Sequence, residues 1–99
     1  MRIRLEVDNS RLIALREAIG AKSLLLEVPE GTTIQDLLVR LETTFGAAFQ
    51  KVSGQVLYER ILRRYCVFVN RKALWLPQQL DRTLTEGDEV AIFLPSGGG

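Results

Sequence analysis

The segment VPEGTTIQDLLVRLETTFG, residues 28–46, joins a turn to the clearest helical pattern in the chain. Thr32 and Gln35 have the spacing of a capping box, and Gly46 suits a left-handed C-terminal stop. The apolar residues recur on one helical face, and they are Ile34, Leu37, Leu38, Leu41 and Phe45. The segment therefore predicts an amphipathic helix that must cover one face of a sheet to bury its apolar stripe.

Two segments before this helix alternate apolar and polar residues, which is the pattern of a strand with one buried face. In RIRLEV, residues 2–7, the apolar positions are Ile3, Leu5 and Val7. In SLLLEV, residues 23–28, they are Leu24, Leu26 and Val28. The two segments predict paired antiparallel strands. Between them, NSRLIALREAIG at residues 9–20 changes to helical spacing and ends in glycine, which predicts a short helix or an ordered loop.

Three further strands are predicted after the helix. YCVFV, residues 65–69, is rich in β-branched and aromatic residues, and a turn at Asn70 and Arg71 follows it. A short strand is expected around ALWL, residues 73–76, with Pro77 ending it. The last strand follows a turn at residues 86–88, and its alternating apolar residues are Val90, Ile92 and Leu94.

The order of these elements predicts an α+β domain over residues 1–94, with a flexible glycine-rich functional tail at residues 95–99. We expect a mixed sheet of four to five strands with one main helix packed on one face. Residues 47–64 are divided by Gly54 and fit either a short helix or a loop with a strand fragment.

Composition excludes several classes of protein. A chain of 99 residues is expected to form one domain, and its residues include no apolar run long enough to cross a bilayer. The start MRIRLEV lacks the apolar stretch of a signal peptide, so we expect a cytoplasmic protein with no membrane partner. Histidine is absent and Cys66 is the one cysteine, so no metal site is expected. Cys66 lies in a predicted strand and is interpreted as a small packed residue.

The charged residues point to neither nucleic acid binding nor catalysis. The net charge is only +1, although ERILRR at residues 59–64 contains three arginines. A nucleic-acid surface normally needs a larger excess, so this cluster is interpreted as solvated or partner-facing. The carboxylates occupy helix, turn and strand-end positions, where they are usually solvated or capping groups. No phosphate-binding loop or dinucleotide fingerprint is present, so we expect no cofactor bound by this chain.

The last five residues, PSGGG at residues 95–99, can extend about 17 Å beyond Leu94. Backbone without Cβ atoms can pass through a channel too narrow for side chains. The terminal carboxylate, with a pKa of about 3.5, is ionised at neutral pH and needs activation, typically by an adenylyl group, before a nucleophile can attack it. The alternative is a frayed terminus without function.

Four quoted segments together resemble the MoaD/ThiS family of ubiquitin-like sulfur carriers, most closely its molybdopterin synthase small subunits. These segments are LREAIG, VPEGTTIQDLL, VFVNRK and LTEGDEVAIFLPSGGG, and the resemblance covers nearly the whole chain. It implies the β-grasp, or ubiquitin-like, fold. The strongest signal is the combination of the GDEV turn, the apolar strand after it and the diglycine at the last two positions.

The resemblance implies that Gly99 is the reacting residue, with Gly97 and Gly98 as the slender tail beside it. In this family a ubiquitin-activating-type enzyme uses ATP to adenylate the terminal carboxylate, which becomes a thiocarboxylate. A sulfur donor protein supplies the sulfur, and an acceptor such as the molybdopterin synthase large subunit receives it. The chain would then be a protein cosubstrate rather than an enzyme, although it could be counted as the small subunit of molybdopterin synthase.

Alternation along the last strand predicts a surface for partners. If Val90 and Ile92 face the helix, Ala91 and Phe93 face outward, and Phe68 does the same on its own strand. The expected partner-binding residues are Phe68, Ala91, Phe93 and Leu94. The alternative is that the two phenylalanines pack under residues 47–64. Trp75 is expected in core or edge packing rather than in binding.

Two other classes of function fit the same sequence. A ubiquitin-like protein modifier would be conjugated through Gly99 to lysines of target proteins, and a plain interaction domain would carry an inert tail. Among sulfur carriers, the recipient could instead belong to thiamine, cysteine or transfer RNA thiolation pathways.

Overall fold

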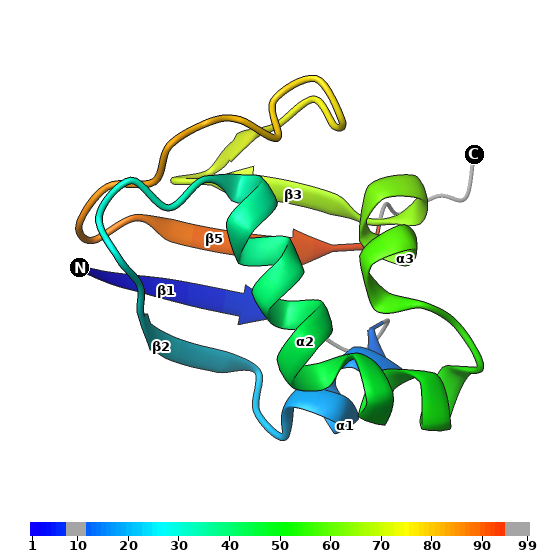
Figure 1. Cartoon of the computed structure of the whole chain (residues 1–99). Helices are drawn as coiled ribbons and strands as arrows, with labels where there is room; N and C mark the ends of the chain where they lie inside the picture. The colour runs from blue at the N-terminus through cyan, green and yellow to red at the C-terminus, as the bar shows by residue number, and fades with distance from the viewer. Residues whose placement is uncertain (8–11, 95–99) are drawn as a thin grey trace.

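The structure, a computed structural model, describes residues 1–7 and 12–94. The chain order of its elements is β1 (Arg2–Val7), α1 (Ile13–Ile19), β2 (Ser23–Glu27), α2 (Ile34–Ser53), α3 (Leu57–Arg64), β3 (Cys66–Val69), β4 (Lys72–Ala73) and β5 (Glu89–Phe93). Figure 1 shows α2 crossing in front of the sheet, with α3 near the end at which β5 finishes. A short helix is one of the two forms expected for the segment 9–20, and in its described part α1 (Ile13–Ile19) has that form.

The strands form one mixed sheet in the order β2-β1-β5-β3-β4. The central strand β5 is parallel to its neighbour β1, and every other neighbouring pair is antiparallel. Leu5 lies opposite Val90 on β5 and opposite Leu24 on β2, so the apolar positions of three strands share one face. The predicted α+β architecture and the pairing of β1 with β2 are confirmed.

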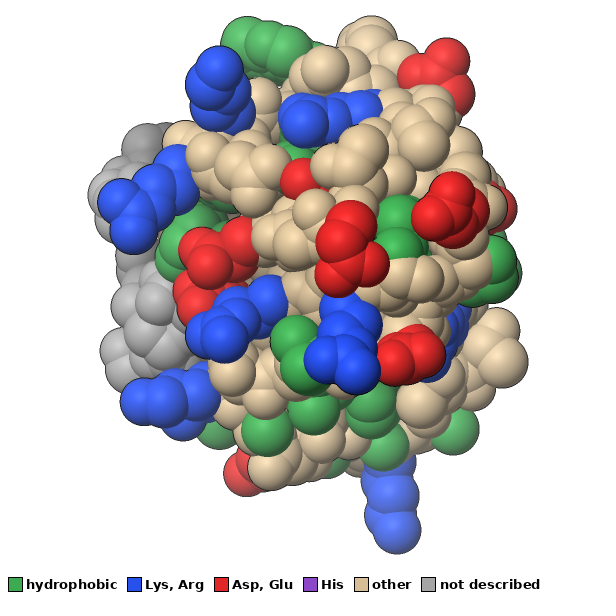
Figure 2. Space-filling view, turned by 90° about the vertical axis from the view of Figure 1, so that its left-hand side faces the viewer, with side chains coloured by type: hydrophobic (Ala, Val, Ile, Leu, Met, Phe, Trp, Pro, Cys, Tyr) green, Lys and Arg blue, Asp and Glu red, His purple; other side chains and the backbone are tan. Residues whose placement is uncertain are grey.

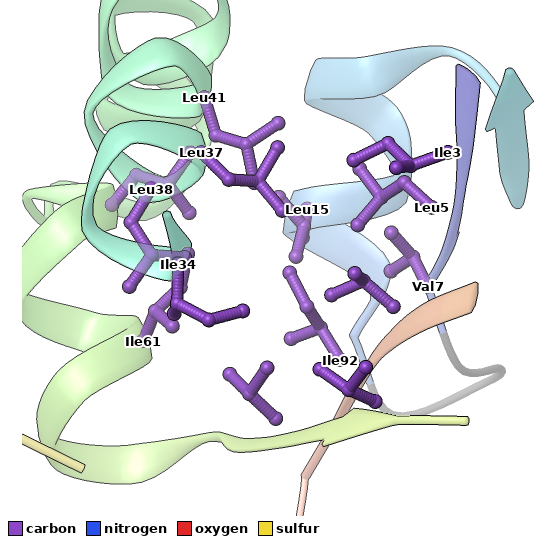
Figure 3. Packing of buried hydrophobic residues seen from close by; sticks show 14 of the residues in the cluster. Ile3, Leu5, Val7, Leu15, Ile34, Leu37, Leu38, Leu41, Ile61 and Ile92 are labelled. Carbon is purple, nitrogen blue, oxygen red and sulfur yellow. The ribbon is translucent and has the colours of Figure 1, made fainter. Parts of the chain in front are cut away.

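The core lies between this face of the sheet and the apolar stripe of α2. Figure 3 shows side chains from β1 and β5 on one side and from α2 on the other, pointing toward one another. The labelled residues are all buried, and they are Ile3, Leu5, Val7, Leu15, Ile34, Leu37, Leu38, Leu41, Ile61 and Ile92. Burying each such side chain contributes about 1.5–3 kcal/mol relative to leaving it in water. Leu15 brings α1 into this core and Ile61 brings α3 into it.

Helix α2 begins one residue later than the predicted capping box. Thr33 is the N-cap: its Oγ1 accepts from the Asp36 amide at 3.1 Å, and the Asp36 carboxylate accepts from the Thr33 amide at 3.0 Å. Thr32 lies before the helix: its hydroxyl donates to the Pro29 carbonyl at 2.6 Å, and its carbonyl accepts from the Leu84 amide. Gln35 accepts a hydrogen bond from the Tyr58 hydroxyl instead of capping. The expected pair of Thr32 and Gln35 was therefore wrong.

Gly46 does not end the helix, because α2 continues to Ser53 and the left-handed cap is Gly54, with φ of 74°. Gly46 is buried, and a Cβ there would overlap the carboxylate of Glu42. That carboxylate accepts from the Tyr58 amide at 2.8 Å and so caps the first turn of α3. The N-cap of α3, Val56, supplies no side-chain cap of its own. Gly46 therefore leaves room for the Glu42 carboxylate between the two helices. Residues 47–64 comprise the end of α2, a short connection and α3, and they contain no strand fragment.

The turn predicted at Asn70 and Arg71 is confirmed, since both residues have positive φ, 50° and 70°. Two consecutive left-handed residues match the twist of the paired strands β3 and β4. The short strand ends earlier than expected. The Leu74 amide still donates to the Val67 carbonyl, but the Trp75 amide donates to the side chain of Gln79. Trp75 is 77% exposed, so the prediction that it packs in the core or at an edge was wrong.

Candidate functional site

The face of the sheet turned away from α2 brings together the aromatic residues predicted to bind partners. Phe68 and Phe93 are half-buried, and their rings meet edge to face with centroids 5.2 Å apart. Cys66 lies opposite Phe93 and Phe68 lies opposite Ala91 across the antiparallel pair of β3 and β5. The two phenylalanines therefore pack on each other across two strands, rather than under residues 47–64.

Ala91 belongs to this face but is not an exposed contact, because only 7% of its surface is accessible. It lies between Glu6 on β1 and Phe68 on β3, its register partners on the two sides. Ala91 therefore lies on the outer face as predicted, but the expectation that it is exposed there was wrong, because the longer side chains of its neighbours cover it. Ala91 makes the floor of a shallow hollow of about 320 Å³.

The hollow, which we call the outer-face hollow, combines apolar and charged groups. Its walls are Phe68 and Phe93, and its rim carries Glu6, Arg71 and Glu89. An apolar floor with a charged rim is the usual composition of a protein-binding patch, in which the centre gives affinity and the rim gives orientation. The lining contains no histidine, cysteine, serine or lysine, and its ionisable groups are two glutamates and one arginine.

Leu94, the last described residue, is half-buried and packs against the core cluster. It therefore attaches the end of β5 to the core at the point where residues 95–99 begin. Its role in partner binding stays a prediction. Gly97, Gly98 and Gly99 lie outside the described residues.

A buried carboxylate holds the strands that present the hollow. Asp88, 6% exposed, accepts from the Thr85 amide and from the Asn70 side chain, each at 2.8 Å. The Asn70 side-chain oxygen in turn accepts from the Glu89 amide at 2.9 Å. Burial alone would raise the pKa of Asp88, but these hydrogen bonds and the charge of Arg82 outweigh it and hold the pKa below its usual value. We call Asp88 and Asn70 the turn latch.

The sequence interpretation did not identify the latch or the charged rim. Two signals could have indicated them. Asn70 and Asp88 stand in turns, where Asn and Asp often bond to nearby backbone, and Glu6 has the outward parity of its strand.

Among residues 1–7 and 12–94, no helix has the length and apolarity needed to cross a membrane. Nor does this part of the chain gather three or more histidine, cysteine, aspartate or glutamate side chains that could hold a metal ion.

The model of the ThiS family matches residues 13–99, which is most of the domain together with the whole tail. The chain belongs to the ThiS family. This family consists of small ubiquitin-like sulfur carriers and modifiers, which work with activating enzymes and sulfur acceptors. A comparison with curated protein sequences found no match.

Solved structures confirm the β-grasp fold of this ThiS-family chain. The HVO 2177 protein of Haloferax volcanii has a TM-score of 0.70 at 24% identity, over 100% of this chain and 87% of that one. SAMP1 of the same organism has a TM-score of 0.67 at 21% identity, over the full length of both chains. A putative molybdopterin converting factor subunit 1 of Pyrococcus furiosus has a TM-score of 0.60 at 18% identity, over 96% of this chain and 98% of that one.

Proposed function

We propose that this ThiS-family protein is a sulfur carrier whose reactive group is the carboxylate of Gly99. The observation that carries the proposal is that the family match runs to the last residue and so includes the diglycine of the tail. The outer-face hollow supports it, because a carrier needs a surface that binds its partners, and the hollow combines apolar and charged groups.

The chemistry has two steps. The Gly99 carboxylate attacks the α-phosphate of ATP bound to a ubiquitin-activating-type enzyme, and pyrophosphate leaves. A sulfide equivalent from a sulfur donor protein then attacks the acyl carbon, the C–O bond to AMP breaks, and a thiocarboxylate remains. Activation is needed because an ionised carboxylate resists nucleophiles.

The pathway we propose is molybdopterin biosynthesis, with the molybdopterin synthase large subunit as sulfur acceptor. One protein of similar fold bears the name of a molybdopterin converting factor subunit. Co-purification of the chain with a synthase large subunit, and transfer of its sulfur to a molybdopterin precursor, tests this part. Transfer only to a thiazole, cysteine or transfer RNA acceptor would contradict the pathway while leaving the carrier function intact.

The carrier function is tested by intact-protein mass spectrometry. The full chain is incubated with ATP, a sulfur donor and each adenylating enzyme of the same cell. We expect a mass increase equal to the difference between sulfur and oxygen, confined to the C-terminal fragment. A chain lacking Gly98 and Gly99 is the control and should not change. An unchanged mass of the full chain with every such enzyme would overturn the proposal.

A second candidate, protein modification, has support from one name among the similar folds, small archaeal modifier protein 1. In that case Gly99 would end in an isopeptide bond to lysines of target proteins. Immunoblots of cells would then show a ladder of conjugates that disappears when Gly98 and Gly99 are deleted. A thiocarboxylate without any ladder favours the carrier.

A further inference from the structure

Helix α3 carries a basic groove that neither the core nor the outer-face hollow uses. A hollow of about 360 Å³ is lined by residues 54–56 and by Glu59, Arg60, Arg63 and Arg64. The opposite side of the helix is apolar, because Leu57 and Ile61 are buried. We call the hollow with its three arginines the α3 groove. Its arginines are the ones that the sequence concentrates in ERILRR.

Among the residues lining the α3 groove, basic groups outnumber acidic ones. The groove holds three guanidinium groups and one carboxylate, that of Glu59. Within the described part of the chain, the ion pair found is Arg2 with Glu27, remote from α3 in the sequence. Burial raises the pKa of Tyr65, and the positive charge of Arg60 partly offsets this rise. Arg63 and Arg64 are exposed, so their side chains are available to a partner.

The α3 groove lies beside the place where the chain enters its tail. Arg64 is the last residue of α3, and two residues later Cys66 lies opposite Phe93, the last residue of β5. Figure 1 shows α3 next to this end of β5. The tail extends at most about 17 Å beyond Leu94, so an enzyme that acts on Gly99 must approach this end of the domain.

Resting on the proposed function, we propose that the α3 groove binds an acidic surface of the adenylating enzyme beside the channel that receives the tail. Arginine is suited to this contact, since its planar group can bind a carboxylate through two parallel hydrogen bonds. Complementary charge also steers the tail toward the channel and raises the association rate.

A nucleic acid is the less favoured occupant of the α3 groove. The whole chain has a net charge of only +1, and the groove has a small local excess. Figure 2 shows acidic and basic side chains interspersed over another face of the molecule, not a basic stripe. Phosphate backbones normally bind to longer basic surfaces than one helical turn provides.

The test measures the KM for the carrier in ATP–pyrophosphate exchange, with the enzyme that adenylates the wild-type chain. The variant Arg63→Gln/Arg64→Gln should raise this KM on the order of tenfold with kcat unchanged. The reason is that the carrier associates less well with the enzyme, whereas the adenylation step itself is unaffected. The control Lys22→Gln/Arg40→Gln removes the same charge from exposed positions elsewhere and should change KM by less than about twofold. Circular dichroism of both variants checks that α3 is retained.

A salt series on the wild-type chain provides a measurement without mutation. Its KM should rise with NaCl concentration more steeply than that of the arginine variant, because screening weakens the same contact. The proposal would be overturned if the two double variants changed KM equally, or if the KM of the wild-type chain and of the arginine variant depended equally on salt. It would also be overturned if Arg63 and Arg64 were needed to bind a short single-stranded RNA while their replacement left the KM unchanged. If the wild-type chain is never adenylated, the proposed function itself fails, which is a different result.

Discussion

Two regions of this molecule differ in the contacts that stabilise them. One is the sheet layer, made of the strands and α2 up to Phe45, and the other is the helical extension at residues 46–64. In the sheet layer, apolar residues recur with the period of a strand or a helix and meet across one broad interface. The extension also buries apolar residues, namely Phe49, Leu57 and Ile61, but the start of α3 depends on a single polar contact, in which the Glu42 carboxylate accepts from the Tyr58 amide. Periodic burial is readable in a sequence, whereas a contact between residues 16 positions apart is not.

The largest expected effect tests the sheet layer at its centre. Leu38 is 0% exposed, and Leu38→Ala should lower the free energy of unfolding by about 2–5 kcal/mol through lost burial and a cavity. Urea denaturation measures the change. Its neighbour Val39 is exposed, so Val39→Ala is the matched control, expected within about 0.5 kcal/mol. Equal losses in the two variants would contradict the assignment of the buried face.

The next effect concerns the turn latch, where the sheet layer depends on a polar group. Asp88→Asn should cost about 1–3 kcal/mol, because it removes a charged acceptor from buried hydrogen bonds. The pKa of Asp88 is lower in the folded than in the unfolded chain, so its contribution is present above the unfolded pKa of about 3.9 and is lost as pH falls through the folded value.

Urea denaturation from pH 7 down to pH 3 checks the sign. The wild-type chain should lose more stability across the acid end of this range than Asp88→Asn does. A steeper loss of stability at acid pH in Asp88→Asn would contradict the stabilising role assigned to the ionised Asp88.

A smaller effect probes the helical extension. Gly46→Ala should cost about 1–2 kcal/mol, because the new Cβ displaces Glu42 and this outweighs the better helix propensity of alanine. In the background of Glu42→Ala the same change should be neutral or stabilising. Hydrogen exchange should show α3 opening in Gly46→Ala while the sheet amides stay protected. Additive effects of the two changes would mean that glycine and glutamate are not coupled.

The smallest expected effect lies at the edge of the sheet layer. Trp75→Ala should alter stability by less than about 0.5 kcal/mol, because 77% of the side chain is already in water. Trp75 is the one tryptophan of the chain, so its fluorescence reports this site alone. Emission typical of a water-exposed indole is expected, and emission typical of a buried one would contradict the placement.

Much of the fold could be predicted because strands and helix repeat their apolar residues regularly. Turn residues were also informative: the turn at Asn70 and Arg71 was predicted, although its left-handed conformation was not. The start of α2 was predicted one residue early, because Thr32 and Thr33 could each be the N-cap. The hydrogen bond from the Leu84 amide to the Thr32 carbonyl, which the sequence does not reveal, places Thr32 before the helix. Of the candidate site, alternation placed Phe68 and Phe93 on one face but gave no measure of how far they cover Ala91.

By itself, the sequence determined the alternation of buried and exposed positions in the strands, the apolar stripe of α2 and the diglycine end, because each is a local pattern. Tertiary structure alone decided that α2 passes Gly46, that Trp75 faces water, and that the arginines of α3 stand beside the end of β5. Each of these depends on which distant groups satisfy a hydrogen bond or fill a space. The physical reason is that periodicity encodes which side of a helix or strand is apolar, whereas the tertiary fold determines which other element packs against that side.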